Sequence, residues 1–463
     1  MQGMPPPFMN VVVIGGGEIG RAIAEALAHE RNEVQIIELD EDVVASLQHD
    51  LDVRVIAGSG SDPAALRKAG IQAAELVAVV TDRDEDNLCA ATLARFFAPQ
   101  AKIIARIRNP ELAAERRFLI HGPPRLTHVL NPELLAANSI FRSIRVPSAI
   151  QVTEFEMGRL LLVGVRLPDT SALAGSTVAG FARSRQKDHG QPPLLVARYR
   201  ENQLVVPKGD TAIEQGDVVY FVTTPSSLRR HVTMLGLPFQ KQRAVAVFGA
   251  TVTGLHLARL MHEAGISVKL VEPDRKLATA ASERLPEIVV LHAEPTDPQV
   301  WADEDLGQSD AIAAVCRDEE VNLMVALMGR RAGVVHTAAL TNRSQYVPLL
   351  LDSGITTVVS PRNAAIGTVL RFLRRGRVLQ VAQTEYEDAE LLEYEVSLQD
   401  PISGMRLMDL GILQGAIVAS TIRGDDVLIP TGASRVQAGD RILLFTRKEV
   451  VHDVESMLLA RQQ

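Results

Sequence analysis

The chain has 463 residues, of which 46% are hydrophobic and 22% charged, so it is long enough for several domains with ordinary cores. Its net charge of −8 argues against nucleic-acid binding, so no nucleic-acid partner is expected. The sequence shows neither a signal-peptide pattern nor an apolar run of the roughly 18 residues that span a bilayer. The two cysteines, Cys89 and Cys316, lie in apolar stretches and are expected to be buried free thiols of a cytoplasmic protein.

The first pattern that predicts a function is a glycine loop near the N-terminus. An apolar strand over Val11–Ile14 leads into Gly15, Gly16, Gly17, Glu18, Ile19 and Gly20, which fit G-x-G-x-x-G. A helix over 21–30 is expected to follow. In this motif the first glycine permits the turn, the second leaves room for a pyrophosphate, and the third lets the helix pack on the sheet. The backbone N–H groups at the helix start are expected to bind the phosphates.

Apolar runs and helical patterns continue to alternate after this loop. Further strands are expected within 33–40, 52–62, 75–82 and 102–111, with helices over 43–49, 64–68 and 84–97 between them. This alternation predicts a doubly wound parallel sheet of the Rossmann type, in an α/β fold.

Polar side chains at the ends of these strands complete a candidate dinucleotide site. Glu38 is expected to accept the ribose hydroxyls, which favours NAD or an adenosine nucleotide over NADP, whereas Asp40 is expected to cap the next helix. Thr81 and Asp82 close the fourth strand, where they either contact the ligand or cap the following helix. Arg106 is the favoured phosphate ligand of the fifth strand; an arginine there could also serve in a surface ion pair.

The second half of the chain repeats this order. Its loop comprises Gly249, Ala250, Thr251, Val252, Thr253 and Gly254, and Glu272 follows at the same distance as Glu38 follows the first loop. Thr251 replaces Gly17, which places a side chain where the pyrophosphate would approach. Ala293 and Pro295 replace Gly58 and Gly60, and the counterpart of Arg106 is Thr341 or Leu340. The second site is therefore expected to be weaker, altered or lost.

Two smaller segments follow the two expected sheets and also repeat each other. Each contains Gly-Asp before an apolar strand, at 216–217 and 439–440, which predicts a tight turn. We expect small α+β domains there, with a polar loop over 183–193. The expected division is a first Rossmann-like domain (9–130), a crossover helix (131–147), a small domain (148–234), a second Rossmann-like domain (243–360), a second crossover helix (361–376) and a second small domain (377–463).

Residues that could act on a bound nucleotide are missing from the sequence pattern. The chain has no G-x-S-x-G, no H-E-x-x-H and no Walker lysine, and no metal site is expected. The lone histidines of the small segments, such as His231 and His452, are more typical of surface positions than of catalytic bases. A nucleotide with no reactive partner indicates sensing, and an NAD-dependent oxidoreductase remains the alternative.

The chain resembles the TrkA family, the NAD-binding regulatory subunits of bacterial Trk potassium uptake systems, which have tandem RCK (KTN) domains. The matching stretches include VVVIGGGEIG, VTDRDEDNL, IARIRNPE and VLNPELLAANSI in the first half. In the second half they include SVKLVEPD, LTNRSQYVPLL and VQAGDRILLF. The resemblance covers nearly the whole chain.

This resemblance implies a fold, a ligand and partners. It implies NAD or NADH on residues 15–19, Glu38, Thr81, Asp82 and Arg106, with ATP or ADP as further candidates, and a second site on residues 249–253 and Glu272. It implies a homotetrameric ring on the cytoplasmic face of the inner membrane, bound to a TrkH-type potassium channel subunit, with the helices after each sheet as crossover links. A regulator of another cation transporter is a further alternative.

Overall fold

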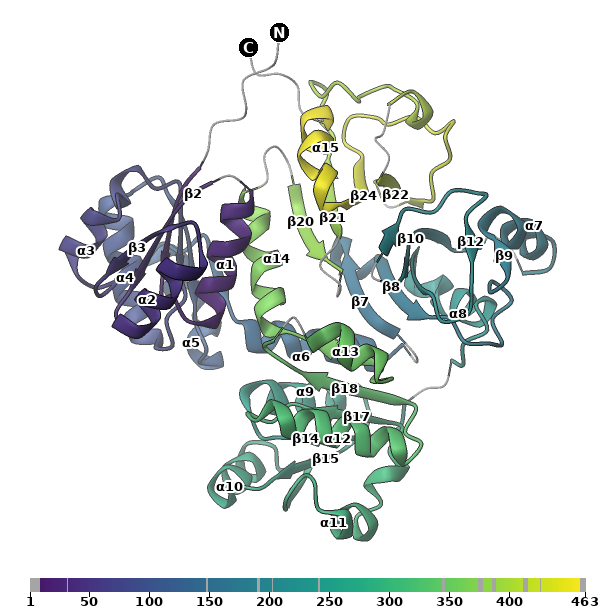
Figure 1. Cartoon of the computed structure of the whole chain (residues 1–463), viewed down its shortest axis with the longest axis horizontal. Coiled ribbons are helices and arrows are strands. Elements are labelled where there is room, and N and C mark those ends of the chain that lie inside the picture. The colour runs from purple at the N-terminus through teal and green to yellow at the C-terminus, as the bar shows by residue number, and fades with distance from the viewer. Residues whose placement is uncertain are drawn as a thin grey trace. The chain divides into compact units, whose positions relative to one another are not determined.

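The computed structural model describes residues 9–458 except 31, 147–148, 190–191, 202, 240–241, 344–345, 374–377, 385–388, 411–414 and 425. These residues form two compact units (Figure 1). The first unit comprises the residues up to 135 together with 361–374, and the second comprises 136–360 and the residues from 375 onward. The expected domain boundaries at 147–148 and 376–377, and the C-terminal end of the last domain, lie outside the described residues.

The first unit is built on a six-stranded parallel sheet in the order β3-β2-β1-β4-β5-β6. Its strands are β1 (Asn10–Ile14), β2 (Glu33–Glu38), β3 (Arg54–Ala57), β4 (Leu76–Val79), β5 (Lys102–Arg106) and β6 (His128–Leu130). In the register of the central strand, Val13 lies opposite Ile36 of β2 and Ala78 of β4. The continuous apolar runs suit a sheet that is buried on both faces, and the order confirms the expected doubly wound fold.

Helices and short turns connect these strands. They are α1 (Glu18–His29), α2 (Glu41–Asp50), α3 (Pro63–Lys68), η1 (Ile71–Ala73), α4 (Asp84–Phe97), α5 (Pro110–Ala114) and η2 (Arg117–His121). The side chains of Asp40, Asp62 and Asn109 accept hydrogen bonds from backbone N–H groups at the starts of α2, α3 and α5. Such caps satisfy donors that a helix leaves free at its N-terminus, and Asp40 has the capping role expected from the sequence.

The second unit contains the same sheet again, in the order β16-β15-β14-β17-β18-β19. Its strands are β14 (Ala244–Phe248), β15 (Ser267–Glu272), β16 (Val289–His292), β17 (Ala311–Ala314), β18 (His336–Leu340) and β19 (Thr357–Val359). The connecting elements are α9 (Val252–Glu263), α10 (Arg275–Arg284), α11 (Pro298–Asp303), η4 (Leu306–Gln308), α12 (Glu319–Arg331) and α13 (Val347–Asp352). The internal repeat in the sequence is therefore a repeat of the fold.

The helix that follows each sheet packs against the other sheet's domain. In α6 (Pro132–Ile144), which follows the first sheet, Ala136, Ala137, Ile140 and Ile144 are buried in one core with residues of β14 and α9. Helix α14 (Pro361–Leu373), which follows the second sheet, packs on α1, where Arg362 pairs with Glu25 at 3.1 Å. The two halves of the chain have thus exchanged their sixth helices.

Each sheet domain is followed by a small α+β module. The first contains β7 (Ala149–Phe155), η3 (Glu156–Gly158), β8 (Leu160–Arg166), β9 (Ser176–Thr177), α7 (Val178–His189), β10 (Leu194–Arg200), β11 (Gln203–Val205), β12 (Ala212–Ile213), β13 (Val218–Thr223) and α8 (Pro225–Met234). The second contains β20 (Val378–Gln383), β21 (Ala389–Glu395), η6 (Leu407–Asp409), β22 (Ala416–Arg423), β23 (Asp426–Leu428), β24 (Arg441–Arg447), η7 (Lys448–Val450) and α15 (Val451–Leu458). Their main sheets are antiparallel, in the orders β11-β10-β13-β8-β7 and β20-β21-β24-β22-β23.

The repeated Gly-Asp pair forms the same turn in both modules. Gly216 and Gly439 have φ values of 78° and 86°, a region that favours glycine. The aspartate that follows is buried and paired with an arginine of the neighbouring strand. The distance from Nε to Oδ1 is 2.5 Å for Arg200 and Asp217, and 2.8 Å for Arg423 and Asp440. The paired aspartates raise the pKa of both guanidinium groups.

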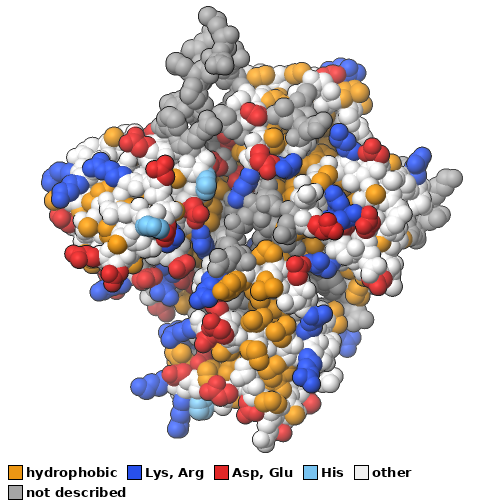
Figure 2. All heavy atoms as spheres, in the orientation of Figure 1, with side chains coloured by type: hydrophobic (Ala, Val, Ile, Leu, Met, Phe, Trp, Pro, Cys, Tyr) orange, Lys and Arg blue, Asp and Glu red, His pale blue; other side chains and the backbone are white. Residues whose placement is uncertain are grey.

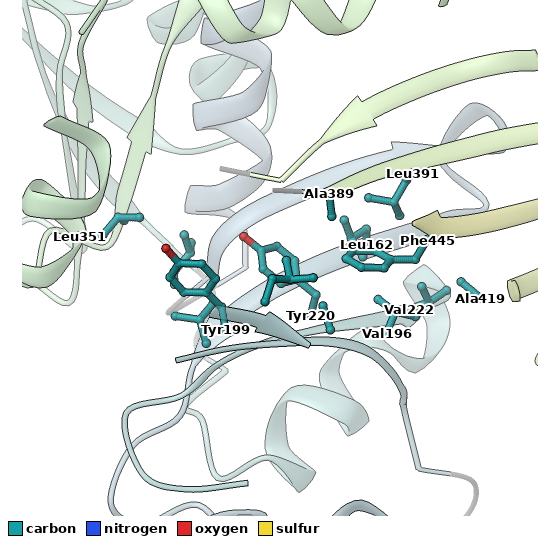
Figure 3. Packing of buried hydrophobic residues seen from close by; sticks show 14 of the residues in the cluster. Leu162, Val196, Tyr199, Tyr220, Val222, Leu351, Ala389, Leu391, Ala419 and Phe445 are labelled. Carbon is teal, nitrogen blue, oxygen red and sulfur yellow. The ribbon is translucent and has the colours of Figure 1, made fainter. Parts of the chain in front are cut away.

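The two modules share one hydrophobic core (Figure 3). Leu162 and Val222 of the first module belong to the same buried cluster as Leu391 and Phe445 of the second. The cluster also includes Leu351 of α13, from the second sheet domain. The two modules are thus packed against each other within one unit.

Three local predictions were wrong. His231, expected at the surface, is buried on α8, where its Nδ1 lies 2.8 Å from Thr223 Oγ1. The polar stretch expected as a loop from residue 183 is helical up to His189, because arginine, glutamine and lysine are good helix formers despite their polarity. Residues 190–191 of that prediction lie outside the described part. Cys89 is exposed on α4 and Cys316 is half-buried, so the prediction that both thiols are buried fails for Cys89; both are free.

Candidate nucleotide sites at the two glycine loops

The first glycine loop joins β1 to α1, and its glycines meet different surroundings. Gly15 has φ +100°, and a Cβ there would lie 2.9 Å from the backbone nitrogen of Thr81. A Cβ on Gly20 would collide with the carbonyl oxygen of Gly15. A Cβ on Gly17, by contrast, would meet no atom within 4 Å. The fold therefore requires glycine at positions 15 and 20, whereas at 17 the space beside the helix start is open to a ligand.

Glu38 lies at the end of β2, directly beside this loop. Its carboxylate accepts hydrogen bonds from the backbone N–H of Gly16 at 2.5 Å, of Leu39 at 2.6 Å and of Asp40 at 2.8 Å. Three donors fix the orientation of the carboxylate, which is only partly buried. Each carboxylate oxygen has two lone pairs, so acceptor sites remain for a ligand's hydroxyl groups.

A buried asparagine, to which sequence reasoning gave no role, fixes the next part of the site. Asn87 on α4 accepts hydrogen bonds from Thr81 N at 2.9 Å and Thr81 Oγ1 at 2.7 Å. Its amide nitrogen donates to Thr81 O at 3.0 Å and to Arg106 O at 2.9 Å. Asn87 therefore ties the end of β4 to the end of β5. The signal in the sequence was its recurrence as Asn322 at the same place in the repeat.

Arg106 is almost fully buried, with 7% exposure, at the end of β5. Its Nη1 lies 3.1 Å from Asp82 Oδ1, and its Nη2 lies 2.6 Å from Glu133 Oε1. Its Nε has no hydrogen-bond partner among the described residues. A buried guanidinium with an unused N–H donor can bind a further anionic group.

Glu133 is the site residue that sequence reasoning missed. It lies in the first turn of α6 and contacts both Arg106 and, at 3.4 Å, Nε of Arg108. Arg108 follows the end of β5 rather than lying within it. No short-range pattern links Glu133 to Arg106, because the two residues are brought together by the sheet.

The second glycine loop has the same backbone path. Gly249 has φ +104°, and a Cβ on Gly254 would collide with the carbonyl oxygen of Gly249. Thr251 replaces Gly17, and its hydroxyl donates to Val315 O at 2.9 Å and accepts from Gly254 N at 3.1 Å. The threonine is thus used as the N-cap of α9.

Glu272 repeats the position of Glu38 in a more buried setting. It accepts hydrogen bonds from Ala250 N at 2.7 Å and Asp274 N at 2.9 Å, and it is 6% exposed. Asn322 repeats the role of Asn87 by donating to Cys316 O and Leu340 O, both at 3.0 Å. The structure therefore brings the second set of predicted residues together as it does the first.

The two sites differ most in their positive charge. Asn322 bonds to Leu340 O as Asn87 bonds to Arg106 O, so Leu340, not Thr341, is the counterpart of Arg106. Thr341 instead bonds to Glu319 at 2.7 Å. The position of Asp82 is taken by Arg317, which is exposed. The second site thus lacks the buried arginine of the first but has an exposed arginine on the neighbouring loop.

In the second domain Pro295 stands in place of Gly60, and an aromatic side chain packs beside it. Trp301 stacks on Phe248 with ring centroids 5.3 Å apart and donates to Pro295 O at 2.7 Å. Nearby, burial and the charge of Glu272 raise the pKa of the Cys316 thiol to about 12, so this thiol stays protonated at neutral pH.

Within the described residues, no group of three or more His, Cys, Asp and Glu side chains is arranged to hold a metal ion. None of the helices in that part of the chain is long and apolar enough to cross a bilayer. On the face drawn in Figure 2, Lys and Arg side chains are interspersed with Asp and Glu, so charges of both signs lie close together there.

Comparison with known families assigns the chain. The TrkA-N domain model matches residues 11–118 and 245–361, and the TrkA-C domain model matches 162–233 and 391–459. The Trk system potassium uptake protein TrkA of Halomonas elongata is 31% identical over 453 residues, covering 97% of this chain and 98% of the relative. The chain belongs to the TrkA family. The protein of the same name from Vibrio alginolyticus is 30% identical over 457 residues, covering 97% and 98%.

Solved structures show the same fold. The GsuK RCK domain superposes with a TM-score of 0.62 at 17% identity, covering 98% of this chain and 96% of that one. The GsuK channel bound to NAD superposes with a TM-score of 0.61 at 17% identity, covering 98% and 80%. TrkA proteins are named as potassium uptake proteins and not as enzymes, which decides against the oxidoreductase alternative.

Proposed function

We propose that this TrkA-family protein is the nucleotide-sensing regulatory subunit of a potassium uptake system. The observation that carries the proposal is the first glycine loop, where open space beside Gly17 lies at a helix start. Glu38 at the end of β2 and Arg106 at the end of β5 supply the two charges that a dinucleotide needs. The relatives' name supplies the link to potassium uptake.

The ligand of the first site is NAD or NADH, with ATP and ADP as the other candidates. Residues 15–20 would bind the phosphates through backbone N–H groups, and Glu38 would accept the ribose hydroxyls. A carboxylate at this position would repel a 2′-phosphate, which disfavours NADP. Thr81 and Asp82 would contact the ligand from the end of β4. A solved GsuK channel bound to NAD and another GsuK structure bound to ADP make both ligand classes reasonable.

Arg106 is the residue through which nucleotide binding would affect helix α6. In this structure its guanidinium is held by Asp82 and Glu133. A nucleotide phosphate near the loop would compete with these carboxylates for the same N–H groups. Glu133 lies in the first turn of α6, and the later residues of this helix are buried against the second sheet. Loss of the ion pair between Glu133 and Arg106 would therefore remove one contact that holds the start of α6.

We propose that residues 249–253 and Glu272 bind a nucleotide at the second site. Thr251 already uses its hydroxyl as a helix cap, and Leu340 offers no charge in place of Arg106. The phosphate contacts would then come from the backbone of the loop and from Arg317. We expect weaker binding there than at the first site.

The assembly proposed is a homotetrameric ring on the cytoplasmic face of the inner membrane, in contact with a TrkH-type potassium channel subunit. Nucleotide binding would shift the ring between arrangements that favour the open and the closed channel, and this requires different affinities in the two states. We propose that the chain divides into the six parts described above, from residue 9 to residue 463. A regulator of another cation transporter remains the second candidate, because it would have the same fold.

Calorimetric titration of NADH, NAD, ATP and ADP tests the first site. Gly17→Val should abolish the tighter binding event, because its side chain enters the space reserved for the pyrophosphate. Glu38→Ala should weaken that event about 10- to 100-fold, since a charged hydrogen-bonding group is lost. Glu41→Ala, at an exposed position on α2, is the matched control and should bind as the wild type does. Unchanged binding in both site variants would remove the first site from the proposal.

A further inference from the structure

The contact between the two small modules contains a buried acid in an apolar face. Along β21, Ala389 and Leu391 belong to the core shared by the modules (Figure 3). Glu393 lies two residues further on and therefore on the same face, because side chains alternate along a strand. It is 4% exposed. A carboxyl group in such a position needs a partner or a proton.

The partner is a second carboxyl group from the first module. Glu156 begins the turn η3, adopts φ 52° and has a side chain that is 1% exposed. Its backbone N–H donates to Oε2 of Glu393 at 3.4 Å. Its own carboxylate is bound by Arg441 Nη1 at 2.6 Å and by Arg159 Nη2 at 3.3 Å. The two carboxyl groups thus meet where the modules meet.

The two arginines near these carboxyl groups form their ion pairs with Glu156 and not with Glu393. Arg441 and Arg159 both bind Glu156, and Arg159 also donates to Gly424 O of the second module at 3.2 Å. The charges of Glu393 and Glu395 also act on Arg441, more weakly than that of Glu156. Glu393 has no ion pair with a lysine or arginine among the described residues, so its negative charge would be uncompensated by direct contact.

The ionisation of the two acids differs accordingly. Burial, together with the hydrogen bond and charge of Glu156, raises the pKa of Glu393 to about 7. Burial would also raise the pKa of Glu156, but the hydrogen bonds of Arg441 and Glu393 and the charges of Arg441 and Arg159 together outweigh it, and the net shift is downward. Below about pH 7 the pair therefore holds one proton, mainly on Glu393, and it loses this proton as the pH rises further.

We propose that the joint between the two small modules is proton-sensitive, closed by a hydrogen bond from protonated Glu393 to Glu156 and loosened when Glu393 loses its proton to solvent. Deprotonation places two carboxylates side by side in an apolar contact, where like charges repel strongly. The sign is fixed by the raised pKa. The stabilising contribution is fully present below the ordinary pKa of a glutamate and is lost as the pH rises through about 7.

The first module shows that the fold does not require this acid. The residue in the matching position of β8 is Gly164, and the space beside it is taken by the ring of Tyr220. The match follows from equivalent hydrogen bonds three residues further along each strand, from Leu167 N to Asp217 O and from Val396 N to Asp440 O. In the first module the ring of Tyr220 thus fills the space beside this position without a carboxyl group. We therefore attribute the carboxyl pair to the contact between the modules.

The test is thermal unfolding of the full chain between about pH 5.5 and about pH 8.5, for the wild type and Glu393→Gln. Glutamine keeps the shape and the hydrogen bond but cannot ionise. The midpoint of the variant relative to the wild type should rise as the pH passes through about 7. The matched control is Glu390→Gln, on the same strand, also buried and on the opposite face, and it should not reproduce the pH-dependent change of Glu393→Gln.

A second variant guards against misfolding of the first. Glu156→Gln removes the neighbouring charge, so the pH at which the midpoint changes should move down toward that of an ordinary glutamate. A flat difference between Glu393→Gln and the wild type over the whole range would overturn the proposal. So would a Glu156→Gln profile that superimposes on the wild type, or a Glu390→Gln profile that reproduces that of Glu393→Gln.

Discussion

Arg106 illustrates how a single residue was partly predictable. Its position at the end of an apolar strand indicated a phosphate ligand. The structure places it beside Asp82, and Asn87 joins its backbone to that of Thr81. Its pairing with Glu133 was not predictable, because that contact joins the fifth strand to a helix reached only after the sixth strand. Residue types at strand ends thus indicated the chemistry but not the competing partners.

This competition gives a testable expectation for Glu133→Gln. Removing the carboxylate frees one side of the Arg106 guanidinium, so the affinity of the first site for a nucleotide should rise by about tenfold, the equivalent of about 1.4 kcal/mol. Arg106→Gln should lower it by about 10- to 100-fold. Fluorescence titration with NADH measures both changes. Glu111→Gln, exposed on α5, is the control; weaker binding in Glu133→Gln would contradict the competition.

At the scale of elements, apolar periodicity located the strands but overestimated their length. The runs expected at 52–62 and 75–82 are strands only over Arg54–Ala57 and Leu76–Val79. The remaining residues turn away from the sheet to form the loops beside the glycine turn, where Gly58 adopts φ +154° and Thr81 bonds to Asn87. Strand ends at a ligand site depend on such side-chain contacts, which periodicity does not encode.

Asn87 is the element-level link, and its removal is expected to affect stability and binding together. Asn87→Ala would leave buried groups of Thr81 and Arg106 unsatisfied, which costs about 1–3 kcal/mol for such a group. Urea denaturation should show a free energy of unfolding lower by about that amount. The equivalent Asn322→Ala in the repeat is the matched variant and should behave alike, since its three bonds to the backbone match those of Asn87. No loss of stability in either variant would contradict this role.

At the scale of the whole molecule, the duplicated order of the chain was predictable because both halves retain the same pattern of strand, glycine loop, helix and acid. Which sheet each sixth helix packs against was not encoded in that pattern, since α6 and α14 are amphipathic in either arrangement. Only the family resemblance implied a crossover. The shared core of the small modules and the acid pair of Glu156 and Glu393 depend on contacts between residues more than two hundred positions apart.

The exchanged helices give the duplication a consequence for the proposed function. Helix α6 begins with Glu133 at the first site, and its later residues are buried in the core of the second sheet domain. The first site retains an open Gly17 and a buried arginine, whereas the second has a capping threonine and an exposed arginine. We therefore expect nucleotide sensing to depend mainly on the first half of the chain.

Potassium flux through a TrkH-type channel reconstituted in vesicles with this protein tests that account most directly. With the wild type, addition of NADH or ATP should change the flux, whereas Gly17→Val should leave it insensitive. Thr251→Val, which alters the second loop, should retain most of the response. Flux that is unaffected by every nucleotide in the wild type, or that responds equally in Gly17→Val, would contradict the claim that the first site senses nucleotide and regulates potassium uptake.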